Sequence, residues 1–340
     1  MSNHIAKIES LLLSDDFSFV IQGFELLKTL PSIDFSAFSF AVRWVDNYQY
    51  SHFGLSKECV HARYVACALY GMRLAQDSSF TPKEPTTRMH FTGPIPPEIG
   101  AFKDLDELNI VLDYGTNIPE LTIPSEIADL PKLRELHITS RDAILRLPEN
   151  IGSCPSLKTI RLDSNTSIEL PHSFGNLSTL ESLTLKQLKG SKISFDGLTS
   201  LQSLSIGDYH SGMDSSALPN LFTQPHPSLK DISLYDTNDT LASWMKYLPL
   251  SELSLEYPKV QTSNFPPNVF PNLEKLFFKG AGLYTLDDTF LTYPKLKKLE
   301  VNTTGTHIII PKSYKHVDFE VEIQTDNVIA PLDVAYSKSF

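Results

Sequence analysis

Long apolar runs, cysteine and glycine are all scarce in this chain of 340 residues. Near the N-terminus the longest apolar run is Leu11–Leu13, which is too short for the apolar region of a signal peptide. No window of the chain approaches the roughly 18 apolar residues that span a bilayer. Cys59, Cys67 and Cys154 make an odd number without metal-ligand spacing, which is typical of reduced thiols. These absences predict a cytoplasmic protein without a membrane partner.

A basic stripe is missing as well. The chain has 29 basic and 40 acidic residues, with a net charge of −11. Nucleic-acid binders need clustered lysine and arginine side chains to displace counterions from phosphates. The densest basic run is the short stretch of Lys295, Lys297 and Lys298. The charge pattern therefore predicts no nucleic-acid partner, and it disfavours an anionic membrane surface.

Proline is abundant, at 23 residues against 15 glycines. Length raises a separate question, because single hydrophobic cores stop growing at roughly 250–300 residues. A chain of 340 residues either divides into domains or has an architecture without a central core. The repeats described next favour the second solution.

The pattern Leu-x-x-Leu-x-Leu, with Ile, Val or Phe as substitutes, recurs at a mean interval of about 23 residues. Its first positions are a degenerate copy at Thr86 and then Leu105, Leu133, Leu157, Leu180, Leu201, Leu229, Leu250, Leu273 and Leu296. Positions 4 and 6 share one face of a strand and stack into a buried column, while positions 3, 5 and 7 face outward. Stacked turns of this kind bury leucine against their neighbours and need no central core.

A second motif, Ile/Leu-Pro-x-x-Ile/Phe, precedes several of these copies and begins at Ile95, Ile123, Leu147 and Leu170. Proline fixes φ and favours the start of a short helical turn. The Ile or Phe three residues later is predicted to pack beneath that turn. Much of the proline is therefore explained as punctuation of the repeat.

Together the two motifs resemble the leucine-rich repeats of plant disease-resistance and Ras-group-related proteins and of their bacterial cytoplasmic relatives. The segment Phe91–Gly100 carries the resemblance most clearly, and the repeats cover 86–323. The resemblance implies an α/β fold, a leucine-rich-repeat solenoid with a curved parallel sheet of about ten turns. It implies little about function, since such repeats serve many unrelated proteins. Asparagine is expected at position 9, but only Asn165 fits, so we expect irregular curvature with other groups filling the gaps.

Both ends depart from the repeat. Residues 1–76 are predicted to form a helical N-terminal cap, 77–85 a connector, and 324–340 a C-terminal tail after an edge strand ending near Ile323. Within the cap, apolar spacing predicts helices over 3–12, over 17–27 with Ser14 or Asp15 as N-cap, over 35–46, and from Ser56 onward. Cys59 and Cys67 would share the apolar stripe of that last helix.

Motifs of catalysis are absent, so the sequence predicts a protein that is not an enzyme and has no cofactor or metal. His90 and His137 both occupy position 5 but two strands apart, too far to share a metal ion, so exposed surface histidines are favoured. Ser205, Asp208 and His210 resemble a triad only superficially, because nothing holds His210 toward Ser205.

The outward face of the middle repeats has a consistent character. Positions 3 and 5 carry polar and mostly small residues, namely Ser182, Thr184, Ser203, Ser205, Asp231, Ser233, Glu252 and Ser254. Large and basic side chains border them, which suits a docked peptide or protein loop. The predicted contact residues on this concave face are Arg161, Thr184, Lys186, Ser205, Tyr209, Ser233, Tyr235 and Phe277. The alternative is that Ser and Thr are simply comfortable on exposed strands.

The sequence thus predicts a monomeric, non-catalytic interaction module that binds a protein or peptide partner. An alternative remains open, a specificity or scaffold subunit that recruits an enzyme through its helical N-terminus. The two long repeats, 105–132 and 201–228, contain insertions from Asp113 and Asp208 that either drifted neutrally or form a rim above the concave face.

Overall fold

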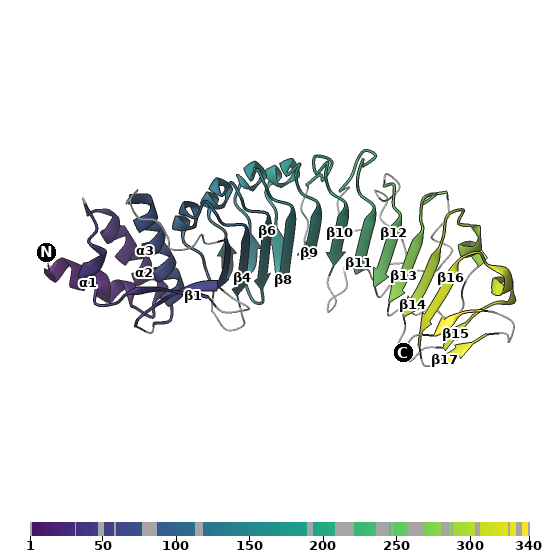
Figure 1. Ribbon diagram of the computed structural model, residues 1–340, viewed down its shortest axis with the longest axis horizontal. Helices are drawn as coiled ribbons and strands as arrows, with labels where there is room; N and C mark the ends of the chain where they lie inside the picture. Colours follow the sequence, from purple (N-terminus) through teal and green to yellow (C-terminus); the bar gives the residue numbers. More distant parts are fainter. Residues whose placement is uncertain are drawn as a thin grey trace. The chain divides into compact units, whose positions relative to one another are not determined.

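We describe the protein from a computed structural model, shown as a ribbon in Figure 1. The structure describes residues 2–30, 32–46, 51–57, 59–76, 87–112, 118–188, 193–207, 221–235, 245, 248–256, 268–279, 286, 288–302, 307–325, 327–330 and 335–338. The predicted connector 77–85 and the insertions that begin at Asp113 and Asp208 lie outside these residues. Contacts divide the chain into two compact units, Met1–Leu157 (unit 1) and Lys158–Phe340 (unit 2).

Unit 1 begins with helices and continues with the first repeats. Its elements are α1 (Ser2–Leu12), α2 (Phe17–Lys28), η1 (Phe35–Ala37), β1 (Val42–Asp46), β2 (Ser51–Leu55), α3 (Ala62–Gln76), β3 (Arg88–Thr92), η2 (Pro97–Ala101), β4 (Glu107–Leu112), β5 (Glu120–Thr122), η3 (Ser125–Asp129), β6 (Glu135–Ser140), β7 (Ile144–Arg146) and η4 (Ile151–Ser153), where η marks one-turn 3₁₀ helices. Strands β3, β4 and β6 form a parallel sheet in register, and β5 pairs with β7 in a second, shorter row.

The predicted helices of the cap are confirmed in part. Helices α1 and α2 occur as expected, but the N-cap of α2 is Asp16, whose carboxylate accepts the backbone N–H of Ser18 at 2.9 Å. The helix predicted over 35–46 is wrong: a 3₁₀ turn is followed by an antiparallel hairpin of β1 and β2. Aromatic and β-branched residues in this segment favour extended backbone over helix.

The third helix starts later than predicted. Ser56 does not cap it; its hydroxyl instead accepts the backbone N–H of Ala41 at 2.7 Å beside the hairpin. Helix α3 begins at Ala62, so Cys59 lies before it and Cys67 is buried within it. The expected shared stripe of the two thiols is therefore wrong.

Helix α3 packs on the first turn of the repeats (Figure 1). A Cβ added to Gly71 would lie 2.6 Å from the backbone oxygen of Glu98, so only glycine allows this approach. Next to it, the rings of Tyr70 and Phe102 stack with centroids 5.9 Å apart. Lys28 also pairs with Glu98 at 3.3 Å. The helices therefore cover the end of the stack inside unit 1.

The described part of unit 2 consists of repeat turns followed by short C-terminal strands. Its elements are β8 (Thr159–Glu169), η5 (His172–Asn176), β9 (Ser182–Leu188), β10 (Ser203–Gly207), β11 (Asp231–Tyr235), β12 (Glu252–Glu256), β13 (Lys275–Lys279), η9 (Asp288–Thr292), β14 (Lys298–Asn302), β15 (His307–Ile309), η10 (Lys312–His316), β16 (Glu320–Gln324), β17 (Asn327–Ile329) and β18 (Ser337–Lys338). Strands β8 to β14, β16 and β18 lie side by side as one parallel sheet, and β15 pairs with β17 (Figure 1).

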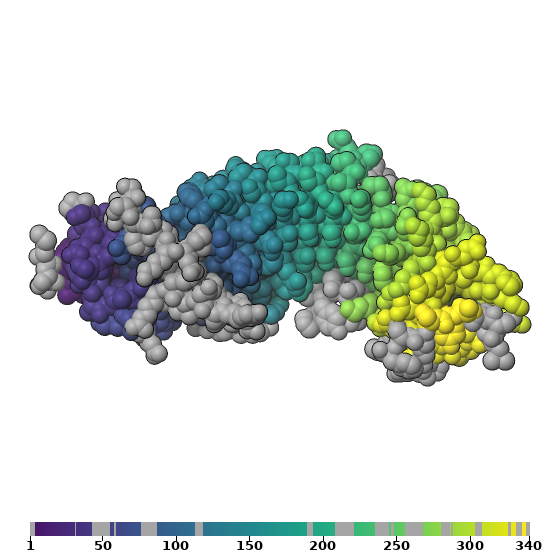
Figure 2. All heavy atoms as spheres, viewed as in Figure 1, coloured from purple at the N-terminus to yellow at the C-terminus, as the bar shows by residue number. Residues whose placement is uncertain are grey.

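The leucine pattern acts as predicted. Position 4 of one turn pairs with position 4 of the next, as Leu183 does with Leu204, and both side chains are almost fully buried. The prolines precede 3₁₀ turns, and the apolar residue three positions later is buried, as with Phe174 after Pro171. Figure 2 shows the side chains of successive turns in close contact. The leucine-rich-repeat solenoid predicted from the sequence is therefore confirmed.

The missing asparagine ladder is replaced by assorted side chains. Asn165 is exposed on β8, and buried Ser140 and Ser164 bond locally, to the Ala143 oxygen and to Thr166. Between turns, Asn150 donates to the backbone oxygen of Ser125 at 2.9 Å. Ser140 and Asn150 thus donate to backbone oxygens of the turns, while the expected irregular curvature stays a prediction.

The segment 324–340 is more than a tail. It contributes β17 and β18, and β18 pairs with β16 through Glu322 and Ser337. The sequence predicted that the strand ending near Ile323 is the edge of the sheet. This prediction is wrong, because β18 lies beyond β16. The short strand β18 extends the sheet because its backbone pairs with the edge that β16 leaves open.

Candidate functional site

The open sheet face is our name for the outward side chains of β8 to β14 and β16. Buried and outward residues alternate along each strand, as in β9, where Leu183 and Leu185 are buried and Thr184 is half-buried. Strand register aligns the outward residues of neighbouring turns in columns. The central column, position 5, runs Arg161, Thr184, Ser205, Ser233, Ser254, Phe277, Glu300 and Glu322.

Small hydroxyl side chains form the floor of this face. Thr184, Ser205, Ser233 and Ser254 occupy consecutive strands β9 to β12, and each is half-buried. Within the described residues, their hydroxyls have no hydrogen-bond partner. The floor is thus low, polar and open to hydrogen bonding by a bound group.

Larger groups border the floor on the side of β8 and β9. Arg161 is exposed in the central column beside Thr184. Lys186, also predicted as a contact residue, pairs with Asp163 at 2.5 Å and is only 23% exposed. Lys186 is therefore neutralised within the protein, whereas Arg161 has no ion pair within the described residues.

A hollow of about 240 Å³ opens at the other end of the floor. It is lined by Ser203, Asp231, Ile232, Ser233, Glu252, Ser254 and Phe277, which come from β10 to β13. Phe277 is half-buried with its ring on the open face, in register with Ser254. The hollow therefore combines an aromatic wall, a hydroxyl floor and two carboxylates.

The two carboxylates of the hollow differ in their surroundings. Glu252 forms an ion pair with Lys275 on the neighbouring strand. The Asp231 carboxylate forms no ion pair or hydrogen bond in the part of the chain described. Burial, and then the nearby charge of Glu252, raise the pKa of Asp231, against the opposing effect of Lys275 and Lys230. The Asp231 carboxylate is thus partly desolvated, and Lys275 and Lys230 act on its charge without forming a direct ion pair with it.

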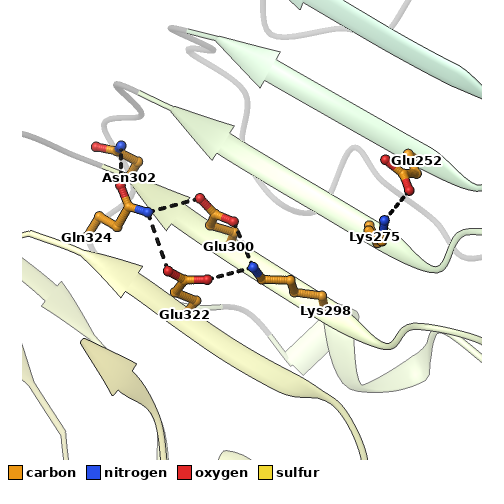
Figure 3. A network of polar contacts seen from close by, with 7 residues as sticks. All are labelled: Glu252, Lys275, Lys298, Glu300, Asn302, Glu322 and Gln324. Atoms are coloured by element: carbon orange, nitrogen blue, oxygen red, sulfur yellow. Dashed lines mark hydrogen bonds and ion pairs between the residues drawn. The ribbon is translucent and has the colours of Figure 1, made fainter. Parts of the chain in front are cut away.

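Beyond Phe277 the face carries a bonded polar network (Figure 3). Lys298 pairs with Glu300 at 3.1 Å and with Glu322 at 2.6 Å, and these two carboxylates raise its pKa. Gln324 donates to Glu300 at 3.1 Å and accepts from Asn302 at 2.7 Å. These groups satisfy one another, so the network stabilises the register of β14 and β16.

The remaining predicted residues are only partly visible. Tyr209 lies outside the described residues, and so do Asp208 and His210 of the triad-like group. Tyr235 ends β11, but the position of its side chain is outside the description. The structure thus brings Thr184, Ser205, Ser233 and Phe277 onto one face and leaves the two tyrosines as predictions.

Metal chemistry finds no support in the described residues, which contain no group of three or more His, Cys, Asp or Glu side chains able to hold an ion. His90 and His137 lie on β3 and β6, each opposite Asn109 of the strand between them. The predicted separation of two strands is confirmed, but both rings are half-buried, so the prediction of exposed surface histidines is wrong.

Sequence reasoning placed Asp231 and Glu252 among the polar residues of the face but not among the contact residues. It also missed the Lys298 network. The available signal was the charge at position 3, where Asp231, Glu252, Lys275 and Lys298 follow one another in register. Which of these charges remain unpaired depends on side-chain geometry, which the repeat pattern does not contain.

A second hollow lies in unit 1, within the cap. It measures about 1220 Å³ and is lined by Ser32, Ile33, Asp34, Phe35, Ser36, Phe38, Ser39, Phe40, Ala41, Val42, Ser56, Leu69, Tyr70 and Arg73. The lining mixes aromatic rings with hydroxyls and the guanidinium of Arg73. This hollow bears on the alternative function that places recruitment at the N-terminus.

Parallel strands in strict register, one per repeat of about 23 residues, with the leucines buried, decide the family. The chain is a leucine-rich-repeat protein. A search of protein-family models finds no match. Among curated proteins, the mouse volume-regulated anion channel subunit LRRC8B is 25% identical over 218 residues, which cover 61% of this chain and 26% of the channel subunit. The chain thus spans about a quarter of the length of the curated relatives that it matches.

Two solved structures of leucine-rich-repeat proteins align with about 70% of this chain. One is a Leptospira interrogans LRR protein, with a TM-score of 0.47, 22% identity and coverage of 73% of this chain and 75% of the other. The second is an internalin from Listeria monocytogenes, with a TM-score of 0.46, 17% identity and coverage of 70% of this chain and 67% of the other. No helix in the described part of the chain is both long and apolar enough to span a bilayer.

Proposed function

We propose that this leucine-rich-repeat protein is a monomeric, non-catalytic binding module of the cytoplasm whose open sheet face holds a protein or peptide segment. The observation that carries the proposal is the floor of Thr184, Ser205, Ser233 and Ser254, bounded by Arg161 and Phe277. Large side chains at the border and small ones between them leave room for a docked segment. A floor built only for solubility needs neither the aromatic border nor the adjoining hollow.

The three free cysteines support the proposed cytoplasmic setting, where thiols stay reduced. Cys67 is buried, and burial raises the pKa of its thiol well above the usual range. Burial also raises the pKa of Cys154, to about 12. Neither thiol is therefore a nucleophile at neutral pH, which agrees with a packing role.

Replacing Ser205 with arginine tests the proposed face. The new side chain projects from the middle of the floor and blocks a docked segment without touching the buried leucines. We expect Ser205→Arg to abolish capture of peptides selected by wild-type protein from a displayed library of random 12-residue peptides. The thermal unfolding midpoint should stay within about 2 °C, since surface substitutions usually change stability by less than about 0.5 kcal/mol.

The matched control is Ser200→Arg, which adds the same side chain on a turn outside the sheet. It should leave peptide capture unchanged. Unchanged capture by Ser205→Arg would show that the selected peptides bind elsewhere, and the assignment of the face would then be wrong.

The alternative, recruitment of an enzyme through the N-terminus, is favoured by one observation, the hollow of about 1220 Å³ in the cap. Its aromatic residues Phe35, Phe38 and Tyr70 offer a surface for an apolar anchor of a partner. Placing an indole ring in part of the hollow with Ser36→Trp should weaken recruitment under this alternative. Peptide capture by the open sheet face should be unaffected.

A further inference from the structure

Arg161 and Asp231 of the open sheet face have no side-chain partner in the described part of the chain, and the hydroxyl floor separates them; Glu320, at the far end of the face on β16, has none either. Arg161 is exposed on β8, at one end of the floor. Asp231 lies in the hollow on β11, toward the other end. Neighbouring charges are paired within the protein: Asp163 with Lys186, Glu252 with Lys275, and Glu300 and Glu322 with Lys298. A bound segment can therefore add an ion pair at two places, and the charges there have opposite signs.

We propose that the open sheet face binds an extended peptide segment that carries one basic and one acidic side chain. The basic side chain fills the hollow between Asp231 and the Phe277 ring, and the acidic side chain pairs with Arg161. This inference rests on the proposed function and names the chemistry of its partner.

The hollow is suited to a guanidinium or an ammonium group. A cation is attracted to the face of an aromatic ring, and Phe277 already has the Lys298 ammonium 5.9 Å from its centroid. The carboxylate of Asp231 accepts hydrogen bonds from the same cation, and such charge-assisted bonds are the stronger kind. The hydroxyls of Ser233 and Ser254 supply further acceptors on the floor.

The burial of Asp231 explains why a cation is favoured there over water alone. Its carboxylate is partly desolvated and stands beside Glu252, while Lys275 is engaged by Glu252. Lys230, at the start of the same strand, is exposed to solvent. A cation of the partner that enters the hollow thus compensates the negative charge of the Asp231 carboxylate.

The strand spacing fixes the separation of the two peptide side chains. The proposed place of the cation, between Asp231 on β11 and Phe277 on β13, lies over β12, four strands from β8, which is about 19 Å at about 4.8 Å per strand. An extended peptide advances about 3.3 Å per residue, so about six residues cover this distance. A segment lying across the strands, over the hydroxyl floor, should therefore have its acidic and basic residues about five to seven positions apart.

The test is a selection from a displayed library of random 12-residue peptides on the full-length protein. We expect the enriched peptides to share an arginine or lysine and, about five to seven positions away, an aspartate or glutamate. For a synthetic peptide of the enriched sequence, calorimetry should show about a tenfold or greater loss of affinity with Asp231→Asn and with Arg161→Gln. Replacing the basic residue of the peptide should weaken its binding to the wild-type protein. The same replacement should lower the affinity for the Asp231→Asn variant little further, because the ion pair is already lost there.

Matched controls separate this result from a general charge effect. Glu320→Gln removes an exposed carboxylate at position 3 outside the hollow, and Lys312→Gln removes an exposed cation from a turn. Both should change the affinity less than about twofold.

The outcomes distinguish the two proposals. One result is capture that is lost with Ser205→Arg but persists with Asp231→Asn, and another is capture that persists when the basic residue of the peptide is replaced. Either result overturns the charge pattern and leaves the proposed face intact. Peptides that bind all variants equally, or a selection that enriches no peptide, overturn both.

Discussion

At the scale of single residues, His226 shows how a buried polar group joins two turns. Its ring is 3% exposed, and its Nε2 donates to the backbone oxygen of Leu198, 3.0 Å away on the preceding turn. Its Nδ1 accepts the backbone N–H of Leu229 at 3.1 Å. This pattern needs the neutral ring, and burial lowers the pKa of His226 below 6.5. The residue therefore links the stability of the stack to pH.

We expect His226→Leu to lower the free energy of unfolding at pH 7.5 by about 1–3 kcal/mol, because it leaves the Leu229 backbone N–H without its acceptor and removes one of the two hydrogen bonds to the Leu198 oxygen. The contribution of His226 is full above pH 6.5, where the unfolded ring is also neutral. It declines as the pH falls below 6.5, because the unfolded chain then binds a proton that the folded ring resists. The gap between wild type and variant should thus narrow from pH 7.5 to pH 5.5 in urea unfolding curves.

The control is His172→Leu, at an exposed ring on η5. This substitution should change the free energy of unfolding at pH 7.5 only slightly. A gap for His226→Leu that stays constant or widens toward pH 5.5 would contradict the neutral form of the buried ring.

At the scale of elements, the spacing between turns depends on close backbone approach. A Cβ added to Gly197 would lie 2.2 Å from the backbone oxygen of Gly175 on the turn before, well inside any real contact distance. Beside these glycines, the rings of Phe174, Phe195 and Phe222 are in contact, tilted and then edge-to-face, with centroids 6.1 and 6.0 Å apart. Small residues outside and aromatic rings inside together set how closely consecutive turns stack.

We expect Gly197→Ala to destabilise unit 2, since the added methyl group forces two backbones apart and overpacking of this kind costs about 1–3 kcal/mol. Chemical denaturation monitored by circular dichroism measures the loss. Thr199→Ala, at an exposed position two residues on, is the control and should change the unfolding free energy by less than about 0.5 kcal/mol. Equal stability of the two variants would mean that the turns relax freely at this point.

At the scale of the whole molecule, the question is what the helical N-terminus does for the repeats. The cap has its own apolar core, including Ile8, Leu12, Phe24, Leu27, Val65 and Leu69. It also covers the first repeat turn through Gly71, Tyr70 and Lys28. Terminal turns of a solenoid need such a cover, because each buries its leucines only against a neighbour.

We therefore expect deletion of residues 1–76 to lower the thermal unfolding midpoint of the remaining repeats, by about 5 °C or more. The deletion uncovers Phe102, which is buried in the intact chain and whose ring stacks on Tyr70 of the cap. Replacing exposed Val60 with serine leaves this contact intact and is the control. A truncated protein with the wild-type midpoint that only loses a recruited enzyme would favour the alternative function.

The repeats and the cap differ in how far the sequence predicted them. The period of the repeat, the burial of Leu183 and Leu204 and the 3₁₀ turn after Pro171 all follow from local pattern, because each turn meets only its neighbours. The pairing of β1 with β2 and the late start of α3 did not follow from the local sequence pattern. There, helical apolar spacing competes with strand propensity, and the decision lies in packing across the cap.

The same division holds for the candidate site and for the molecule as a whole. By itself, the sequence determined the absence of basic stripes and long apolar runs, the stacking of turns without a central core, and the small polar floor. Only the tertiary structure decided that Lys186, Glu252 and Lys298 are neutralised while Arg161 and Asp231 keep unpaired charges. The physical reason is that a period-two pattern determines which face a side chain occupies, whereas ion pairing depends on which side chains meet across strands.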